Sequence, residues 1–192
     1  MPTLTLTLRL WASTRRRLRV CGFRSLLGTL LMTSPVVPDS QWYDDTYKRL
    51  ANLKLKDPSL KVFVTVGGWD FNNLGPTATT FSDLAASIPA QRSFAKSLLS
   101  FMATYNFDGV DIDWEYPGPN RYGRKADYVN FPIFIENLKV ALRASGGRDG
   151  VSVALPASYR EFEDIWMNHF QLLTSPFQST SSISTLRNSR HP

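Results

Sequence analysis

Three carboxylates at every second position are the most distinctive feature of this sequence. They are Asp111, Asp113 and Glu115, in the stretch DGVDIDWEYP that spans residues 108–117. Side chains alternate between the two faces of a strand, so a strand here would carry all three carboxylates on one face. Its other face would carry the apolar side chains of Val110, Ile112 and Trp114. The apolar face can pack under helices, and the carboxylate face then points into a barrel lumen or a cleft.

The spacing of these carboxylates predicts that they share a proton. Neighbours on one face of a strand are about 6.6 Å apart. Two unit charges at that distance repel by about 2.5 kcal/mol at an effective dielectric constant of about 20. The row should therefore hold at least one proton at neutral pH. Glu115, at the C-terminal end of the strand, is the candidate general acid. Asp113 can hold or relay the proton, and Asp111 tunes Asp113.

Other interpretations of this acidic stretch stay open. A helix would also align Asp108, Asp111 and Glu115, although Gly109 and Pro117 disfavour a helix. A calcium loop of the EF-hand kind needs Gly at its sixth position and Glu at its twelfth. Counted from Asp111, both positions hold tyrosine. A magnesium site built from carboxylates is a further alternative, but no other acidic cluster supports it. We therefore predict no metal ion and no cofactor.

The segments around the acidic stretch are predicted to alternate between strands and helices. Strands are expected over 61–66, 106–114 and 151–155, and helices over 44–55, 89–105, 127–144 and 160–173. Residues 72–80 and 117–124 are predicted to be loops, and Asp127 is expected to cap the helix that follows it. This order is typical of βαβ units around a parallel sheet.

The positive charge of the chain is concentrated at its N-terminus. The chain has 192 residues and a formal net charge of +6. Residues 1–38 hold six arginines and no acid, whereas the rest has 16 basic and 16 acidic residues. Electrostatics therefore gives the body of the protein no reason to bind nucleic acid. No apolar run is long enough for a transmembrane helix. The single cysteine, Cys21, excludes an internal disulfide.

The acidic stretch resembles the DGxDxDxE signature of glycoside hydrolase family 18, the chitinase family. Residues 64–69 resemble the SxGG motif of that family, with Thr in place of Ser. Residues 154–159 are similar to the segment after the catalytic strand in large fungal, killer-toxin-like chitinases. The resemblance covers about residues 39–159. Four residues of these motifs are expected to support the site structurally: Asp108, Thr65, Gly67 and Gly68.

The resemblance implies an α/β fold that forms part of a (β/α)8 TIM barrel, roughly strands three to five with their helices. It implies hydrolysis of β-1,4-linked N-acetylglucosamine in chitin, with retention and with attack by the substrate's own acetamido group. Glu115 would be the acid and base, Asp113 would orient the acetamido group, and Asp111 would tune Asp113. Trp69 and Tyr116 would stack on sugar rings or pack at the rim. The implied partners are chitin or chitooligosaccharides.

Three segments are predicted along the chain. Residues 1–38 are expected to be a basic leader outside the domain, either an organelle transit peptide or a misassigned start, and no convincing secretory signal. Residues 39–173 are expected to hold a partial family 18 catalytic domain. Residues 174–192 are rich in Ser and Thr, contain no acid, and are expected to be disordered. An extracellular or cell-wall location follows from the resemblance alone.

Parts of the family pattern are not found in this chain. The basic leader stands where the first two barrel strands are expected, and no Met-x-Tyr segment follows Tyr159. The chain is therefore expected to be a fragment, poorly soluble, with its carboxylate face open to water. Two alternatives to a chitinase stay open. One is a non-catalytic chitin-binding or vestigial chain, and the other is an endo-β-N-acetylglucosaminidase that acts on N-glycans.

Overall fold

The computed structural model describes residues 8–11, 17–21, 41–156 and 186–187. Side chains are described from residue 45 to residue 156, apart from residue 121. These residues form an α/β structure in which helices pack on one face of a mostly parallel sheet. The helix predicted over 160–173 lies outside the described residues.

Five strands form the main sheet in the order in which they occur along the chain. They are β1 (Leu8–Trp11), β2 (Arg17–Cys21), β3 (Lys61–Gly67), β4 (Gly109–Asp113) and β5 (Gly150–Val153). β1 is antiparallel to β2, and every later neighbour is parallel. The three predicted strands are confirmed. The middle one is shorter than expected at both ends, and Asn106 before it has a left-handed backbone (φ 56°) that a strand does not accommodate.

The strands β1 and β2 come from the basic segment that was expected to lie outside the domain. β2 pairs with β3 in register, with Leu18 opposite Val62 and Cys21 opposite Thr65. The backbone pairing of β1 and β2 continues the sheet. The prediction that the basic segment lies outside the domain is therefore corrected at these two strands. The bounds of the domain stay a prediction.

A second, two-stranded sheet joins segments far apart in the sequence. It pairs β6 (Leu155–Pro156) with β7 (Leu186–Arg187) in parallel. β7 lies within the segment that was expected to be disordered, so that expectation is corrected at these two residues.

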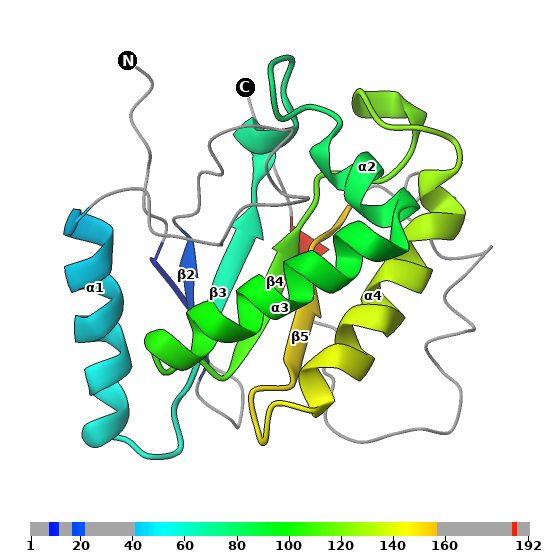
Figure 1. The fold of residues 1–192 in the computed structure, drawn as a ribbon. Helices are drawn as coiled ribbons and strands as arrows, with labels where there is room; N and C mark the ends of the chain where they lie inside the picture. The colour runs from blue at the N-terminus through cyan, green and yellow to red at the C-terminus, as the bar shows by residue number, and fades with distance from the viewer. Residues whose placement is uncertain (1–7, 12–16, 22–40, 157–185, 188–192) are drawn as a thin grey trace.

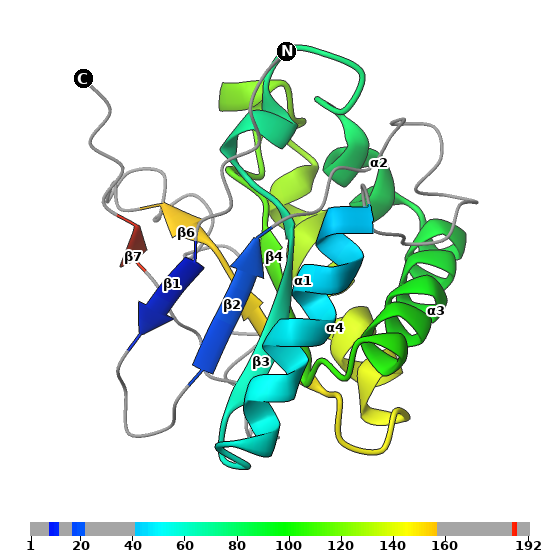
Figure 2. The same ribbon diagram turned by 90° about the vertical axis from the view of Figure 1, so that its left-hand side faces the viewer.

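The helices cover one face of the main sheet, which Figures 1 and 2 show from two directions at right angles. They are α1 (Gln41–Ala51), α2 (Thr80–Ala86), α3 (Ile88–Thr104) and α4 (Asp127–Arg143), with 3-10 turns η1 (Asn52–Leu55), η2 (Trp69–Asn72) and η3 (Pro119–Arg121). The predicted helices over 44–55, 89–105 and 127–144 are confirmed, the first as α1 together with η1. Within the described residues, no helix has the length and hydropathy that crossing a membrane needs.

One helix was missed by the sequence analysis. α2 begins at the last residue of the predicted loop 72–80 and fills the segment before the next predicted helix, and it packs against α3 and α4. Its seven residues make only about two helical turns, which is too short for a hydrophobic period to stand out.

One apolar core lies between the sheet and the helices. Val62, Val64 and Val66 of β3 belong to it, and so do Val110 and Ile112 of β4. Trp114 follows β4 and inserts between two helices. Its ring stacks on Phe81 of α2 at 5.4 Å between centroids, and it meets Phe131 of α4 edge-on, also at 5.4 Å. The prediction that this face packs under helices is confirmed.

Candidate active site

The three predicted carboxylates lie at the C-terminal half of β4 and just beyond it. Asp111 and Asp113 are strand residues, whereas Glu115 comes two residues after the strand ends, and the peptide bond between Glu115 and Tyr116 is cis. Because Val110 and Ile112 are in the core, alternation places the two aspartates on the opposite face. Glu115 therefore extends the row as a residue of the following loop, and not as a strand residue.

All three carboxylates are buried. Asp111 and Asp113 are each 4% exposed, and Glu115 has no exposed surface. The expectation that this face is open to water is therefore wrong. Charged groups without water are costly unless neighbouring polar groups hold them, so the contacts around this row determine its chemistry.

Asp111 is held from both sides by hydroxyl groups on the neighbouring strands. Thr65 on β3 donates to one carboxylate oxygen at 3.3 Å, and Ser152 on β5 donates to the other at 2.5 Å. The three residues are direct register partners across the sheet, so their side chains share a face. The supporting role of Thr65 in the site stays a prediction. Ser152 was not singled out from the sequence, because alternation in β5 does not reveal which residue of β4 lies beside it.

Gly67 and Gly68 carry the chain away from β3 toward the acidic loop. Their φ angles are +106° and +116°, a region that side chains with a Cβ rarely adopt. A Cβ on Gly67 would lie 2.5 Å from the carbonyl oxygen of Asp113. The N–H of Gly68 donates to that same oxygen at 2.8 Å. The two glycines therefore allow the close approach of the loop after β3 to the end of β4.

The loop after β3 also contacts the backbone of Glu115. Asn72, the last residue of η2, is buried, and its side-chain oxygen accepts a hydrogen bond from the Glu115 N–H at 3.3 Å. Trp69 begins η2, Tyr116 follows Glu115, and both are half-buried. Asn72 was missed from the sequence because only the folded loop brings it to a residue 43 positions away.

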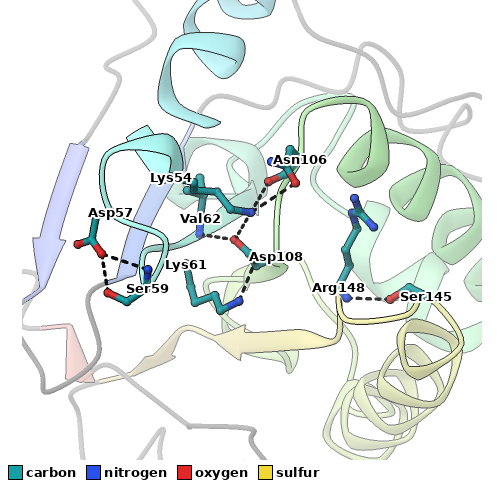
Figure 3. Close-up of polar contacts among 9 residues, drawn as sticks. All are labelled: Lys54, Asp57, Ser59, Lys61, Val62, Asn106, Asp108, Ser145 and Arg148. Atoms are coloured by element: carbon teal, nitrogen blue, oxygen red, sulfur yellow. Dashed lines mark hydrogen bonds and ion pairs between the residues drawn. The ribbon is translucent and has the colours of Figure 1, made fainter. Parts of the chain in front are cut away.

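Asp108 directly precedes β4 and so lies at the opposite end of that strand from Glu115. Its carboxylate accepts from the Val62 N–H at 2.9 Å and pairs with Lys54 and Lys61 at 2.9 and 3.3 Å (Figure 3). The Asp108 N–H in turn donates to the Val62 carbonyl at 2.8 Å. Asp108 thus joins the N-terminal ends of β3 and β4, and its supporting role in the site stays a prediction.

Asp127 organises the loop that follows the acidic row. It is the first residue of α4 and fully buried, and it does not cap that helix as expected. One of its carboxylate oxygens accepts from Ser82 of α2 at 2.8 Å and from the N–H groups of Arg124 and Gly118 at 2.6 and 3.4 Å. A negative charge at the N-terminus of a helix also interacts favourably with the helix dipole. Arg124 further pairs with Asp83 at 2.6 Å.

Metal binding by the acidic row was a further alternative. Among the residues whose side chains are described, no group of three His, Cys, Asp or Glu side chains lies close enough to hold a metal ion. Hydroxyl donors hold the carboxylate of Asp111. The helical alternative for the acidic stretch is excluded because residues 109–113 form β4.

Comparison with known families agrees with this geometry. A family model described as "Glycosyl hydrolases family 18" matches residues 22–175. The chain belongs to this family. The match includes the acidic row, the glycine turn and β5, and it begins before the predicted start of the domain. The predicted resemblance and the α/β fold, part of a (β/α)8 barrel, are confirmed.

Individual family 18 relatives are similar over a little more than half of the chain. Chitinase A1 of Niallia circulans is 33% identical over 138 residues, which cover 64% of this chain and 19% of that protein. The killer toxin subunits alpha/beta of Kluyveromyces lactis are 35% identical over 121 residues, 60% of this chain and 10% of that protein. This chain therefore spans about a fifth or less of the length of these relatives.

A solved family 18 structure carries the same fold. Catalytic domain 2 of a Group II chitinase from Ostrinia furnacalis, in a mutant form in complex with penta-N-acetylchitooctaose, superposes with a TM-score of 0.57 at 26% identity. The superposition covers 70% of this chain and 37% of that one.

Proposed function

We propose that this chain is a chitinase-type glycoside hydrolase that cleaves β-1,4-linked N-acetylglucosamine in chitin or chitooligosaccharides. The observation that carries the proposal is the position of Glu115. It extends a row of buried carboxylates just beyond the C-terminal end of a parallel strand, where (β/α)8 barrels have their active sites. Membership of family 18 and the oligosaccharide complex of the Ostrinia furnacalis relative support chitin as the substrate class.

The proposed reaction uses the acetamido group of the substrate as its nucleophile, the route of family 18. Glu115 gives its proton to the glycosidic oxygen as the bond from that oxygen to the anomeric carbon breaks. The acetamido carbonyl oxygen attacks the anomeric carbon, and an oxazolinium ion forms. Retention then requires a second displacement at the same carbon. Glu115, now a carboxylate, takes a proton from water. That water attacks the anomeric carbon, reopens the ring and leaves the product with its original configuration.

The two aspartates prepare this reaction. The Asp113 carboxylate is proposed to accept a hydrogen bond from the acetamido N–H. This bond turns the acetamido carbonyl toward the anomeric carbon, and the charge of Asp113 offsets the positive charge of the oxazolinium ion. Asp111 tunes Asp113 from two residues earlier on the same face. Its own carboxylate is held by the hydroxyls of Thr65 and Ser152, so it keeps a fixed place beside Asp113.

The half-buried rings of Trp69, in the loop after β3, and of Tyr116, next to Glu115, are proposed to stack on sugar rings. Glu115 has no exposed surface in this structure. A glycosidic oxygen therefore reaches it only when the groups that cover it move aside. Action on chitin also implies an extracellular or cell-wall location.

Glu115→Gln in the full chain tests the proposal. Gln keeps the shape of the side chain and cannot donate the acidic proton. We expect turnover of a fluorogenic chitotriose substrate to fall by about 10²-fold or more, while binding to chitin oligomers stays within about threefold. Glu136→Gln on the exposed face of α4 is the matched control, and it should leave both quantities unchanged.

Three outcomes would contradict the proposal. Glu115 is not the acid if its Gln variant hydrolyses the substrate at the wild-type rate. A wild-type chain that binds chitin oligomers without hydrolysing them is instead a non-catalytic chitin-binding protein. A wild-type chain that cleaves the chitobiose core of an N-glycan and not chitotriose is an endo-β-N-acetylglucosaminidase.

A further inference from the structure

The loop after β3 follows the backbone of residues 113–115 through three successive contacts. Gly67 leaves room for the Asp113 carbonyl oxygen, and the Gly68 N–H donates to that oxygen at 2.8 Å. Asn72 then accepts from the Glu115 N–H at 3.3 Å. The first two contacts need only backbone atoms and the lack of a Cβ. The third depends on the chemistry of one side chain.

The side chain of Asn72 is not explained by its packing. It is 1% exposed, and its amide nitrogen has no hydrogen-bond partner within the part of the chain that the structure describes. The Glu115 N–H is a donor, so it requires the amide oxygen and thereby sets the orientation of the amide group. A buried NH₂ group without an acceptor destabilises a fold relative to an apolar side chain of similar size. The contact that sets Asn72 apart from such a side chain is its bond to Glu115.

Other contacts hold the loop in place without Asn72. The ring of Phe71 packs on Phe81 at 5.4 Å between centroids, and the Phe71 carbonyl accepts from the Thr77 hydroxyl at 2.7 Å. Neither contact involves Glu115. A substitution at Asn72 should therefore remove the bond to the Glu115 N–H and leave the course of the loop unchanged.

We propose that Asn72 is a positioning residue for Glu115. The amide oxygen of Asn72 holds the Glu115 N–H, which limits the rotation of the peptide that carries the acid. The Glu115 side chain then keeps one direction relative to Asp113 during proton transfer. This inference rests on the proposed function for its catalytic consequence, but the contact itself can be tested without turnover.

Three variants of the full chain separate positioning from stability. Asn72→Leu removes the acceptor and keeps a side chain of similar size. Asn72→Asp keeps an acceptor oxygen in the same place. Gln91→Leu on α3 is the matched control, because Gln91 is also a buried amide, bonded to the Ala85 carbonyl and to Asn137, both at 2.8 Å. It removes hydrogen bonds of the same kind away from the acidic row.

The first measurement is the hydrogen-exchange rate of the Glu115 amide, observed by NMR. In Asn72→Leu this rate should rise about tenfold or more, whereas in Asn72→Asp and Gln91→Leu it should stay within about threefold of wild type. Equal exchange rates in Asn72→Leu and wild type would overturn the proposal. If Asn72→Leu does not fold, a rise in Glu115 exchange in the folded Asn72→Asp variant would also overturn it.

The second measurement is turnover of the fluorogenic chitotriose. Asn72→Leu should lower kcat about tenfold with little change in KM, because it disturbs the acid and not the sugar contacts. Asn72→Asp should recover part of kcat, and Gln91→Leu should keep all of it. An equal fall of kcat in Gln91→Leu would mean that lost stability alone explains the effect of Asn72→Leu. That result would overturn the proposal. If the wild-type chain hydrolyses no substrate, the proposed function fails, and the exchange rates still decide the role of Asn72.

Discussion

At the scale of single residues, hydrogen-bond donors on neighbouring strands determine how the buried row is held. Asp111 receives one hydroxyl from β3 and another from β5, so each of its carboxylate oxygens has a donor. A buried carboxylate that loses one donor bears the cost of an unsatisfied charged group. Ser152 therefore matters to a site whose recognisable motif lies wholly on another strand.

The contribution of Ser152 can be measured with two substitutions. Ser152→Ala removes the donor to Asp111, and we expect the free energy of unfolding to fall by about 2 kcal/mol. Ser152→Thr keeps a hydroxyl and should recover most of that loss, which chemical denaturation of both variants would measure. An alanine variant as stable as wild type would show that the bond to Asp111 contributes nothing to the fold.

At the scale of elements, the loops after β3 and β4 form the site together, and helices outside the sheet hold them. Trp114 anchors the end of β4 between α2 and α4 through Phe81 and Phe131. Asp127 joins the same two helices to the loop after the acid through Ser82 and the backbone of that loop. The short helix α2 thus supports the loop that carries Glu115 although it contributes no residue to the carboxylate row.

The role of Asp127 predicts a large effect on stability from one substitution. Asp127→Ala leaves the Ser82 hydroxyl and the N–H groups of Gly118 and Arg124 without their acceptor, and we expect a loss of about 3 kcal/mol. Asp45→Ala on the exposed face of α1 should change stability by no more than about 0.5 kcal/mol. Thermal unfolding of the two variants measures the difference. Equal unfolding midpoints in the two variants would show that Asp127 does not organise this loop.

At the scale of the whole molecule, one apolar core joins β3, β4 and β5 to the four helices. A shared core couples these elements, so they should unfold together. Both faces of β4 are buried, the first by this core and the second around the carboxylate row. The stability of the strand that carries the carboxylate row is therefore inseparable from the packing of the helix layer.

This coupling is tested by a pair of leucine substitutions. Leu98 of α3 is fully buried, and Leu98→Ala should lower the free energy of unfolding by about 3 kcal/mol through the cavity that it leaves. Leu55 is 82% exposed, and Leu55→Ala should be nearly neutral. A single transition, shifted downward in Leu98→Ala by both near-UV and far-UV circular dichroism, is the expected result. Separate transitions in the two signals would contradict a shared core.

The strand that carries the acidic row was predictable from sequence because its signals are local and strong. Alternating carboxylates and apolar residues define the two faces of β4 with no knowledge of the rest of the chain. The long helices α3 and α4 were predictable for a similar reason, since each presents several turns of hydrophobic period. The glycine pair after β3 marked a sharp turn, and its motif together with the acidic one indicated the family.

Tertiary structure alone decided how the row is supported and whether water reaches it. Strand register, which no residue encodes by itself, places Ser152 beside Asp111. The course of a loop brings Asn72 to the backbone of Glu115, and the missed helix α2 brings Ser82 to Asp127. Burial of the carboxylates depends on contacts among segments distant in sequence. Local patterns therefore identified the row of carboxylates, while long-range packing determined the contacts that surround it.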